Sequence, residues 1–268
     1  MILRHARTPV DGQPIENTFC ALAERSGNIL GESVIYVDYN PVLYPVRPLQ
    51  VRIQLDRADV PDSLLGATIT RAREICDLSG EYCRIFAHCA PNDSALMERL
   101  TPFGFQDTDG LVRMQMRLPT HHKLKLPAGC TVVRDDLSDP LERKYFLERY
   151  NQLFNAERDT NWLTQYIDRP GFMRILTVAP TGMAGEILIW REQYSGVIGY
   201  IQTSKRWRRL GVASYMLSLA CEAFEQMDLY CAEASVRVRH PHMLKLMTKA
   251  GFSQSELLMR YPGIDINP

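Results

Sequence analysis

Charge of either sign is not in excess in this sequence of 268 residues, because 31 lysines and arginines balance 31 aspartates and glutamates. Proteins that bind nucleic acid or membrane surfaces through phosphates carry a basic excess, so neither is expected as a partner. The sequence also lacks any run of about 18 apolar residues, which excludes a transmembrane helix. Charged residues near its start stand where a secretory signal needs its apolar stretch. We expect a soluble, cytoplasmic protein.

Closely paired cysteines are also missing, since no Cys-x-x-Cys motif occurs. Such pairs are typical of structural zinc sites and of redox motifs, so the sequence predicts no metal centre. In a reducing cytoplasm, separate cysteines act as small, mostly buried side chains. We therefore expect the cysteines to be free thiols: Cys20, Cys76, Cys83, Cys89, Cys130, Cys221 and Cys231.

The segment LPTHHKLKLP, residues 118–127, is the most polar break near the middle of the chain. Two prolines and flanking strand-like sequences indicate a linker, and residues 1–119 and 126–268 are predicted to form separate domains. The adjacent His121 and His122 have no third metal ligand at a useful spacing, which favours a linker over a metal site.

Both predicted domains end with the same succession of elements. In each, a strand and an amphipathic helix precede a Gly-Phe pair, at Gly104 and at Gly251, and another apolar strand follows. Glycine suits the left-handed residue that ends many helices, and the following phenylalanine can pack back on the helix. This repeat predicts a duplicated α/β unit.

The second half has a longer series of predicted elements. The patterns give helices over 141–154 and 157–167, strands over 174–178, 186–190 and 197–203, a helix over 212–227 and a strand over 233–238. The long helix has apolar residues at the i, i+3, i+4, i+7 spacing of one buried face. The predicted helix 212–227 begins a short loop after the predicted strand 197–203.

That loop, between strand 197–203 and helix 212–227, has the composition of an anion site. It carries four basic side chains and two small residues: Lys205, Arg206, Arg208, Arg209, Gly211 and Ala213. The first N–H groups of a helix have no partner inside the helix and lie at the positive end of its dipole, so a phosphate or pyrophosphate can bind there. The alternatives are a solvated basic loop and a nucleic-acid patch with Trp207 as a stacking platform.

The segment R-R-L-G-V-A, residues 208–213, resembles the signature of the GCN5-related N-acetyltransferases, the GNAT superfamily. That signature reads Gln or Arg, two residues, Gly, one residue, then Gly or Ala, and the order of elements over residues 131–261 is also similar. The resemblance implies an α/β protein with mixed sheets, made of two GNAT-like acyl-CoA N-acyltransferase domains in tandem. It further implies acetyl-CoA as co-substrate and a primary amine of a small molecule or peptide as acceptor.

By the same resemblance, backbone amides at the helix start hold the pyrophosphate. The end of the preceding strand holds the pantetheine arm and polarises the thioester carbonyl. The implied residues are Ile201, Gln202, Thr203, Arg208, Arg209, Leu210, Gly211, Val212, Ala213, Ser214 and, at the end of the next strand, His240. The amine attacks the thioester directly, and no covalent enzyme intermediate is implied.

The last helix departs from the family pattern N-x-x-A-x-x-x-Y-x-x-x-G-F. Counting back from Gly251, His240, Met243 and Met247 hold the Asn, Ala and Tyr positions. The family's Tyr protonates the leaving thiolate, and Met247 has no proton to give. Because imidazole titrates near neutral pH, His240 is a candidate catalytic acid. A bound water, a lost catalytic step, and a histidine with no chemical role are the alternatives.

The base that deprotonates the amine is expected to be a carboxylate. Glu186, on a central strand, is the candidate catalytic base, and Glu157 and Asp159 lie where the family shapes its acceptor pocket. A salt bridge is the alternative for each. Three aromatic residues of the same region either line that pocket or pack in the core: Phe154, Trp162 and Tyr166.

The first half lacks the signature loop. After the strand 51–55, Ser63, Gly66 and Thr68 stand where Arg or Gln, Gly, and Gly or Ala are required, and no helix pair is predicted before its first strands. We predict that the first domain does not bind coenzyme A and acts as a partner or lid for the second.

Three functions remain open from the sequence. The first is an acetyl-CoA-dependent N-acyltransferase, and the second is a coenzyme A-binding regulatory or interaction module that has lost catalysis. The third is a nucleic-acid-associated factor, which the neutral charge disfavours. A monomer and a homodimer are both compatible with the sequence.

Overall fold

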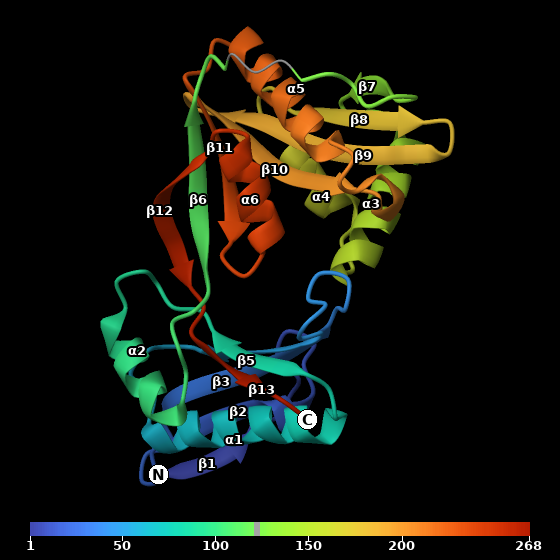
Figure 1. Ribbon diagram of the computed structural model, residues 1–268. Coiled ribbons are helices and arrows are strands. Elements are labelled where there is room, and N and C mark those ends of the chain that lie inside the picture. The colour runs from blue at the N-terminus through green and yellow to red at the C-terminus, as the bar shows by residue number, and fades with distance from the viewer. Residues whose placement is uncertain (121–123) are drawn as a thin grey trace. The chain divides into compact units, whose positions relative to one another are not determined.

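A computed structural model of the protein describes residues 1–120 and 124–268, which divide into two compact units. The first comprises Met1–Gly110, Leu153–Asn155 and Leu258–Pro268, and the second comprises Leu111–Gln152 and Ala156–Leu257. Each unit is built around one β-sheet (Figure 1). Each also has its own hydrophobic core. The histidine pair of the predicted linker lies outside the described residues.

In the described part of the first unit, the strand order is β1-β2-β3-β4-β5-β13. Its strands are β1 (Ile2–His5), β2 (Thr18–Leu22), β3 (Ile29–Tyr39), β4 (Leu49–Leu55), β5 (Cys83–Ala87) and β13 (Gly263–Ile266). β4 and β5 run parallel and the other neighbours are antiparallel. The helices are α1 (Asp62–Ser79) and α2 (Ser94–Leu100), and α1 packs its apolar face against β3 and β4.

In the described part of the second unit, the strand order is β12-β6-β11-β10-β9-β8-β7. The strands are β6 (Gly110–Arg117), β7 (Thr131–Asp135), β8 (Met173–Ala179), β9 (Gly182–Glu192), β10 (Ser195–Thr203), β11 (Cys231–Arg237) and β12 (Ser253–Arg260). The helices are α3 (Pro140–Phe154), α4 (Thr160–Ile167), α5 (Val212–Gln226) and α6 (Pro241–Lys249). The order of elements predicted for the second half is confirmed.

Two strands belong to the sheet of the opposite half of the sequence. β6, which ends the first half, pairs antiparallel with β11, and β13, near the end of the chain, pairs antiparallel with β5. Each therefore occupies the same position, beside the second strand of a parallel pair. The two sheets thus exchange strands across the division that the sequence predicts at residues 119–126.

The repeated Gly-Phe pairs end their helices as expected. Gly104 and Gly251 have φ angles of 89° and 99°, in the left-handed region that glycine adopts without a steric penalty. Phe105 and Phe252 are 3% and 2% exposed, and their backbone N–H groups donate back to Leu100 and to Met247. Both phenylalanines therefore fold back over the helix that they follow.

The helix α5 lies close against the second sheet because two glycines leave room for it. A Cβ on Gly185 would lie 2.6 Å from Cε of Met216, and one on Gly196 would lie 2.2 Å from the ring of Phe224. Burying side chains such as Met216 and Phe224 contributes about 1.5–3 kcal/mol each. Figure 1 shows α5 running across this sheet. A Cβ on Gly185, which pairs with Thr203, would also lie 2.8 Å from Cγ1 of Val212, so the first residue of α5 lies near the end of β10.

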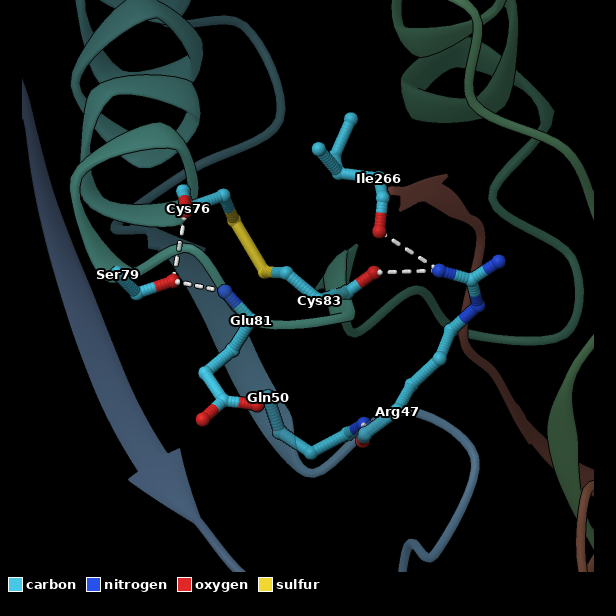
Figure 2. Close-up of a disulfide and its surroundings, with 7 residues drawn as sticks. All are labelled: Arg47, Gln50, Cys76, Ser79, Glu81, Cys83 and Ile266. Atoms are coloured by element: carbon cyan, nitrogen blue, oxygen red, sulfur yellow. Dashed lines mark hydrogen bonds between the residues drawn. A yellow bond between two sulfur atoms is a disulfide. The ribbon is translucent and has the colours of Figure 1, made fainter. Parts of the chain in front are cut away.

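The prediction that every cysteine is a free thiol is wrong for two of them. Cys76 of α1 and Cys83, the first residue of β5, form a disulfide across a sequence separation of 7 residues (Figure 2). The turn between them is tight, since Ser79 Oγ donates to the Cys76 carbonyl at 2.6 Å and accepts from Glu81 N at 3.2 Å. A helix that reverses directly into a strand thus brings together cysteines that form no recognisable motif.

The other cysteines of the described chain are free, and four of them are buried. Burial raises the pKa of Cys89 and of Cys221 to about 12, so both are neutral thiols at physiological pH. Within the described residues, no helix combines the length and the apolar character that crossing a membrane requires.

Candidate functional site

The parallel strands β10 and β11 separate part-way along their length. Their pairing runs from Ser195 opposite Cys231 to Ile198 opposite Ala234. Beyond that point, within the described chain, β10 pairs only with β9 as far as Thr203, and β11 pairs only with β6 as far as Arg237. The facing edges of residues 201–202 and 235–236 are therefore not paired with each other, and a ligand between them could supply the partners that backbone N–H and C=O groups require.

The separation coincides with a bulge in β10. The register against β9 shifts between Ile198 and Tyr200, at Gly199. A Cβ on Gly199 would lie 1.8 Å from the ring of Trp190, so only glycine allows the indole to lie over the strand there. A bulge bends the strand that contains it, and this bend turns β10 away from β11.

The start of α5 is built as the sequence predicts. Gly211 precedes the helix with a φ of 85°, Arg209 is also left-handed at 67°, and no side chain of the described residues caps the helix. The first residues of α5 therefore present backbone N–H groups that have no intrahelical partner, at the positive end of the helix dipole. A Cβ on Gly211 would meet nothing within 4 Å, so the space in front of the helix is open.

Basic side chains surround this helix start. Lys205, Arg206, Arg208 and Arg209 are all exposed, and no acidic residue lies in the first turn of α5. Trp207 packs against the hydrophobic core of the second unit, which leaves less of its ring for stacking on a base. The arrangement suits a compact, multiply charged anion such as a pyrophosphate.

His240 and Met247 occupy very different surroundings. His240 is half-buried, follows β11 by three residues and immediately precedes α6, where its backbone N–H donates to the Arg237 carbonyl at 2.9 Å. Met247 is 1% exposed and is part of the core. Met247 therefore has neither a proton nor access to a ligand, whereas His240 lies at the end of the strand that borders the opening.

Glu186 is enclosed in an ion-pair network on the sheet face opposite α5. Its carboxylate has no exposed surface and accepts from Arg149 Nη2 at 2.8 Å and from Arg174 Nη1 at 3.4 Å. Arg174 is itself 1% exposed and also pairs with Asp135 and Glu142, at 2.6 and 2.7 Å. Burial raises the pKa of Glu186, and the two arginines oppose that effect.

The other residues predicted for the acceptor site do not come together in one place. Asp159 caps α4 by accepting from Trp162 N at 2.9 Å, which explains why this helix begins at Thr160 rather than at residue 157. Glu157 is exposed. Phe154 belongs to the first unit and is not part of the aromatic pocket described next.

Aromatic rings line a small, half-open pocket beside Glu186, on the same face of the second sheet. The pocket is lined by Tyr150 of α3, Trp162 and Tyr166 of α4, Leu188 and Trp190 of β9, and Gly199 and Tyr200 of β10. Trp162 and Tyr166 were anticipated from the sequence. Tyr150, Trp190 and Tyr200 were not, because they come from separate elements and only strand pairing brings them together. The sequence held one signal for them: along β9 and β10, side chains alternate between the two faces of the sheet, so Trp190 and Tyr200 are predicted to lie on the face opposite their direct neighbours.

The corresponding region of the first unit has none of these features. Ser63, Gly66 and Thr68, the residues aligned with the signature, all lie inside α1 rather than before it. Thr68 is fully buried, and its Oγ1 lies 2.6 Å from that of Ser33. No group of three or more His, Cys, Asp and Glu side chains that could hold a metal ion occurs in the described parts of either unit.

Solved structures share this architecture over most of the chain. A GCN5-related N-acetyltransferase from Sphaerobacter thermophilus matches with a TM-score of 0.54 and 14% sequence identity, covering 96% of this chain and 84% of that one. A conserved protein of unknown function from Enterococcus faecalis V583, described as a probable N-acyltransferase, matches with a TM-score of 0.56 and 12% identity, over 91% of this chain and 61% of that one. The chain has the GNAT fold.

The expected fold class, α/β with two GNAT-like units of mixed sheet in tandem, is therefore confirmed. A GCN5-related glucosamine N-acetyltransferase region of a fungal multi-domain β-N-acetylglucosaminidase also matches, with a TM-score of 0.51 and 12% identity, over 92% of this chain and 33% of that one. No protein-family model matches the sequence, and no curated protein does. The structural matches show a GNAT fold. At these identities they do not show the activity, which has to be argued from the chemistry of the site.

Proposed function

We propose that this protein is an N-acyltransferase that transfers an acetyl group from acetyl-CoA to a primary amine. The observation that carries the proposal is the opening between β10 and β11 next to the uncapped start of α5. A strand edge that offers hydrogen bonds and a helix start that offers free amides lie in sequence order on one segment. Such a segment suits a long ligand with a peptide-like arm and a pyrophosphate.

The residues present fit that ligand. Backbone amides of residues 209–214 would hold the pyrophosphate, and Arg208 and Arg209 would add charge-assisted contacts. The edge of Ile201 and Gln202 that is unpaired toward β11 would hydrogen-bond the pantetheine arm, and it continues into Thr203, whose carbonyl accepts from Arg208 Nε at 3.4 Å. An N–H of the same edge would polarise the thioester carbonyl, an oxyanion-type effect worth about 3 kcal/mol.

The reaction supplied by acetyl-CoA is acyl transfer: the amine nitrogen bonds to the carbonyl carbon, the carbon–sulfur bond breaks, and the thiolate leaves with the electron pair. His240, three residues after β11 and just before α6, is our candidate for the group that protonates this thiolate. Its position at the border of the opening, and the absence of a proton on Met247, support that role.

Glu186 is the less accessible of the two catalytic candidates. A carboxylate with no exposed surface, held by two guanidinium groups, meets an acceptor amine only through an intervening group. We therefore propose that Glu186 holds Arg149 and Arg174 in place beside the acceptor pocket, and that the attacking amine loses its proton to water. On this proposal, Glu186→Gln keeps kcat within about tenfold, whereas a direct base would cost about a hundredfold or more.

A coenzyme A-binding module without catalysis is the second candidate, and the buried Met247 favours it. The two functions differ in one measurement, the release of free thiol from acetyl-CoA in the presence of an amine panel. An enzyme releases thiol with an amine and not without one, and His240→Ala slows that release. Binding of acetyl-CoA with no thiol release over the whole panel would identify the module instead.

The proposal also carries expectations about the protein's setting. We expect an amine acceptor as its partner, a cytoplasmic location, and a monomer or homodimer. The disulfide between Cys76 and Cys83 removes the cysteine argument for a reducing compartment. The cytoplasmic location therefore rests on the supply of acetyl-CoA that the proposed reaction needs.

A further inference from the structure

We propose that Asn40 of the first unit is a positioning residue for the amine acceptor. It caps the end of α3 and so fixes two side chains that α3 places on the acceptor side of the proposed site, Arg149 and Tyr150. The inference rests on the proposed function for its kinetic consequence. The cap itself can be measured in the protein alone, without acetyl-CoA or an amine.

The last residues of α3 belong to the first unit. The helix covers Pro140–Phe154, and Leu153–Asn155 is part of the first unit, whereas the helix up to Gln152 is part of the second. A helix leaves the carbonyls of its last turn without partners inside the helix. The end of α3 is therefore held by whichever groups donate to those carbonyls.

Asn40, the residue after β3, supplies one of these donors. Its Nδ2 donates to the Leu153 carbonyl at 2.9 Å, across a sequence separation of 113 residues. Its Oδ1 accepts from Val42 N at 3.1 Å and from Leu43 N at 3.0 Å, which orders the loop after β3. Asn40 is 3% exposed. One end of a buried amide thus holds its own loop, and the other end holds the helix.

Asn155, the residue after α3, is bound by the same segment of the first unit. Its φ of 48° is in the left-handed region that ends many helices and that asparagine adopts more readily than most residues. Its Nδ2 donates to Oδ1 of Asp38, near the end of β3, at 3.0 Å. Residues 38–40 therefore bind both the last turn of α3 and the residue that ends it.

The capped turn of α3 carries the side chains that matter for the acceptor. Arg149 precedes Leu153 by four residues, about one helical turn, and its Nη2 donates to Glu186 Oε1 at 2.8 Å. Tyr150 precedes Leu153 by three residues, and its ring centroid lies 4.6 Å from that of Trp162 in α4. Fraying of the last turn of α3 would therefore displace both side chains.

The connection from α3 to α4 depends on the same helix end. Asn151 Oδ1 accepts from Arg158 N at 2.8 Å, and Asn151 Nδ2 donates to the Arg158 carbonyl at 2.8 Å. The next residue, Asp159, caps α4. The residues proposed for coenzyme A lie on β10 and at the start of α5 instead. Loss of the cap is therefore expected to affect the amine and not acetyl-CoA.

Amide hydrogen exchange of the full-length protein, followed by mass spectrometry, tests the cap. Asn40→Asp keeps the oxygen that orders the loop and loses the donor to Leu153, so the amides of residues 150–158 should exchange about tenfold faster. The matched control is Asn17→Asp, since Asn17 is 6% exposed and its Oδ1 accepts from Arg71 Nε at 3.3 Å. The control should leave exchange of residues 150–158 unchanged.

Asn40→Ser gives a second test if Asn40→Asp fails to fold. A serine oxygen accepts from the amide two residues ahead as an asparagine oxygen does, but serine has no amide nitrogen to reach Leu153. The same increase in exchange is expected. Unchanged exchange of residues 150–158 in a folded Asn40 variant, or an equal increase in Asn17→Asp, would overturn the inference.

Kinetics separate this inference from the proposed function, with spermidine, ethanolamine and the tripeptide Ala-Ala-Ala as amines. In Asn40→Asp, the KM of an amine that releases thiol should rise about tenfold, whereas kcat and the Kd of acetyl-CoA stay within about twofold. An unchanged KM, or an equal loss of acetyl-CoA affinity, would overturn the positioning role. Faster exchange in a protein that releases no thiol with any of these amines would keep the cap and remove both the enzyme and the kinetic role.

Discussion

The two units contain the same parallel strand pair, and they use it differently. In the first unit, β4 and β5 pair from Leu49 opposite Cys83 to Ile53 opposite Ala87, the whole length of β5. In the second, β10 and β11 stop at Ile198 opposite Ala234. The closed pair makes a continuous core sheet, and the open pair leaves a strand edge that we propose binds coenzyme A. A bulge at Gly199 accompanies this opening of the strand pair.

The loops after these strands differ in charge as well. Residues 56–62 of the first unit contain three aspartates and one arginine, whereas residues 205–211 of the second contain four basic residues and no acid. Asp62 occupies the first turn of α1 and pairs with Arg99 at 2.9 Å, and the same guanidinium donates to the carbonyls of Ala58 and Val60. The start of α1 thus carries a carboxylate of its own, which disfavours a bound anion there.

The largest effect that the comparison predicts is at the start of α5. Gly211→Glu places a negative charge and a strained backbone at the proposed pyrophosphate site, and acetyl-CoA affinity should fall at least about a hundredfold. The matched control is Gly104→Glu, since Gly104 also has a left-handed φ, 89°, and open space around its Cβ. Calorimetric titration of both variants checks this, and an equal loss in the two would mean that backbone strain alone explains the result.

The next effect concerns the covalent link that only the first unit has. Cys76→Ala with Cys83→Ala should lower the stability of the first unit by about 2 kcal/mol, because the disulfide closes a short loop. All three tryptophans lie in the second unit, so their urea transition should not move, whereas the far-ultraviolet circular dichroism transition should shift.

Cys231→Ala is the matched control for that experiment. Cys231 begins β11 as Cys83 begins β5, and it is a free thiol. Its replacement should leave the circular dichroism transition of the first unit in place. A tryptophan transition that shifts with loss of the disulfide would show that the two units do not unfold independently.

A smaller effect is expected from the buried ion-pair network, which the second unit builds around Glu186. Burial raises the pKa of Glu186 above its ordinary value of 4.5, so this group favours folding below about pH 4.5 and loses that contribution as pH rises through its folded-state pKa. Glu186→Gln stays neutral, and its unfolding free energy should fall less than that of the wild type between pH 4.5 and pH 8. Urea unfolding at the two pH values checks the sign, and a steeper fall in the variant would contradict it.

The smallest effect concerns the charge of the loop after each parallel strand pair. It tests whether this charge alone decides which unit binds acetyl-CoA. Asp59→Asn with Asp62→Asn makes the loop before α1 less acidic without opening β4 from β5. We expect no second acetyl-CoA site, because the strand edge that would hold the pantetheine arm stays paired. Calorimetry that finds a second site in this variant would show that the loop charge, and not the strand opening, decides which unit binds.

The sequence predicts local features of this fold well and long-range pairing poorly. The Gly-Phe helix ends and the loop before α5 depend on a few adjacent residues, so Gly104, Gly251 and Gly211 were sufficient to find them. The exchange of β6 and β13 was not found, because an alternating pattern identifies a strand and does not name its neighbour. β13 has only four residues, too few for a clear periodicity.

In the candidate site, too, features made of adjacent residues could be predicted, and features that join separate elements could not. The loop before α5 is one continuous segment, and α5 begins at Val212 after a left-handed Gly211 as expected, whereas anion binding there stays a prediction. The disulfide and the aromatic pocket each join residues from separate elements: α1 with β5, and α3 and α4 with β9 and β10. Trp162 and Tyr166 are one helical turn apart and could be found together, whereas Trp190 reaches them only after β9 pairs with β10.

The most direct test of the comparison is the stoichiometry of acetyl-CoA binding to the wild-type chain, measured by calorimetric titration. The account predicts one site per chain, because among the described residues only the pair β10 and β11 is open beside a basic, uncapped helix start. Two sites per chain would show that the closed first unit binds as well. No binding to the folded protein would contradict the assignment of the opening as a coenzyme A site.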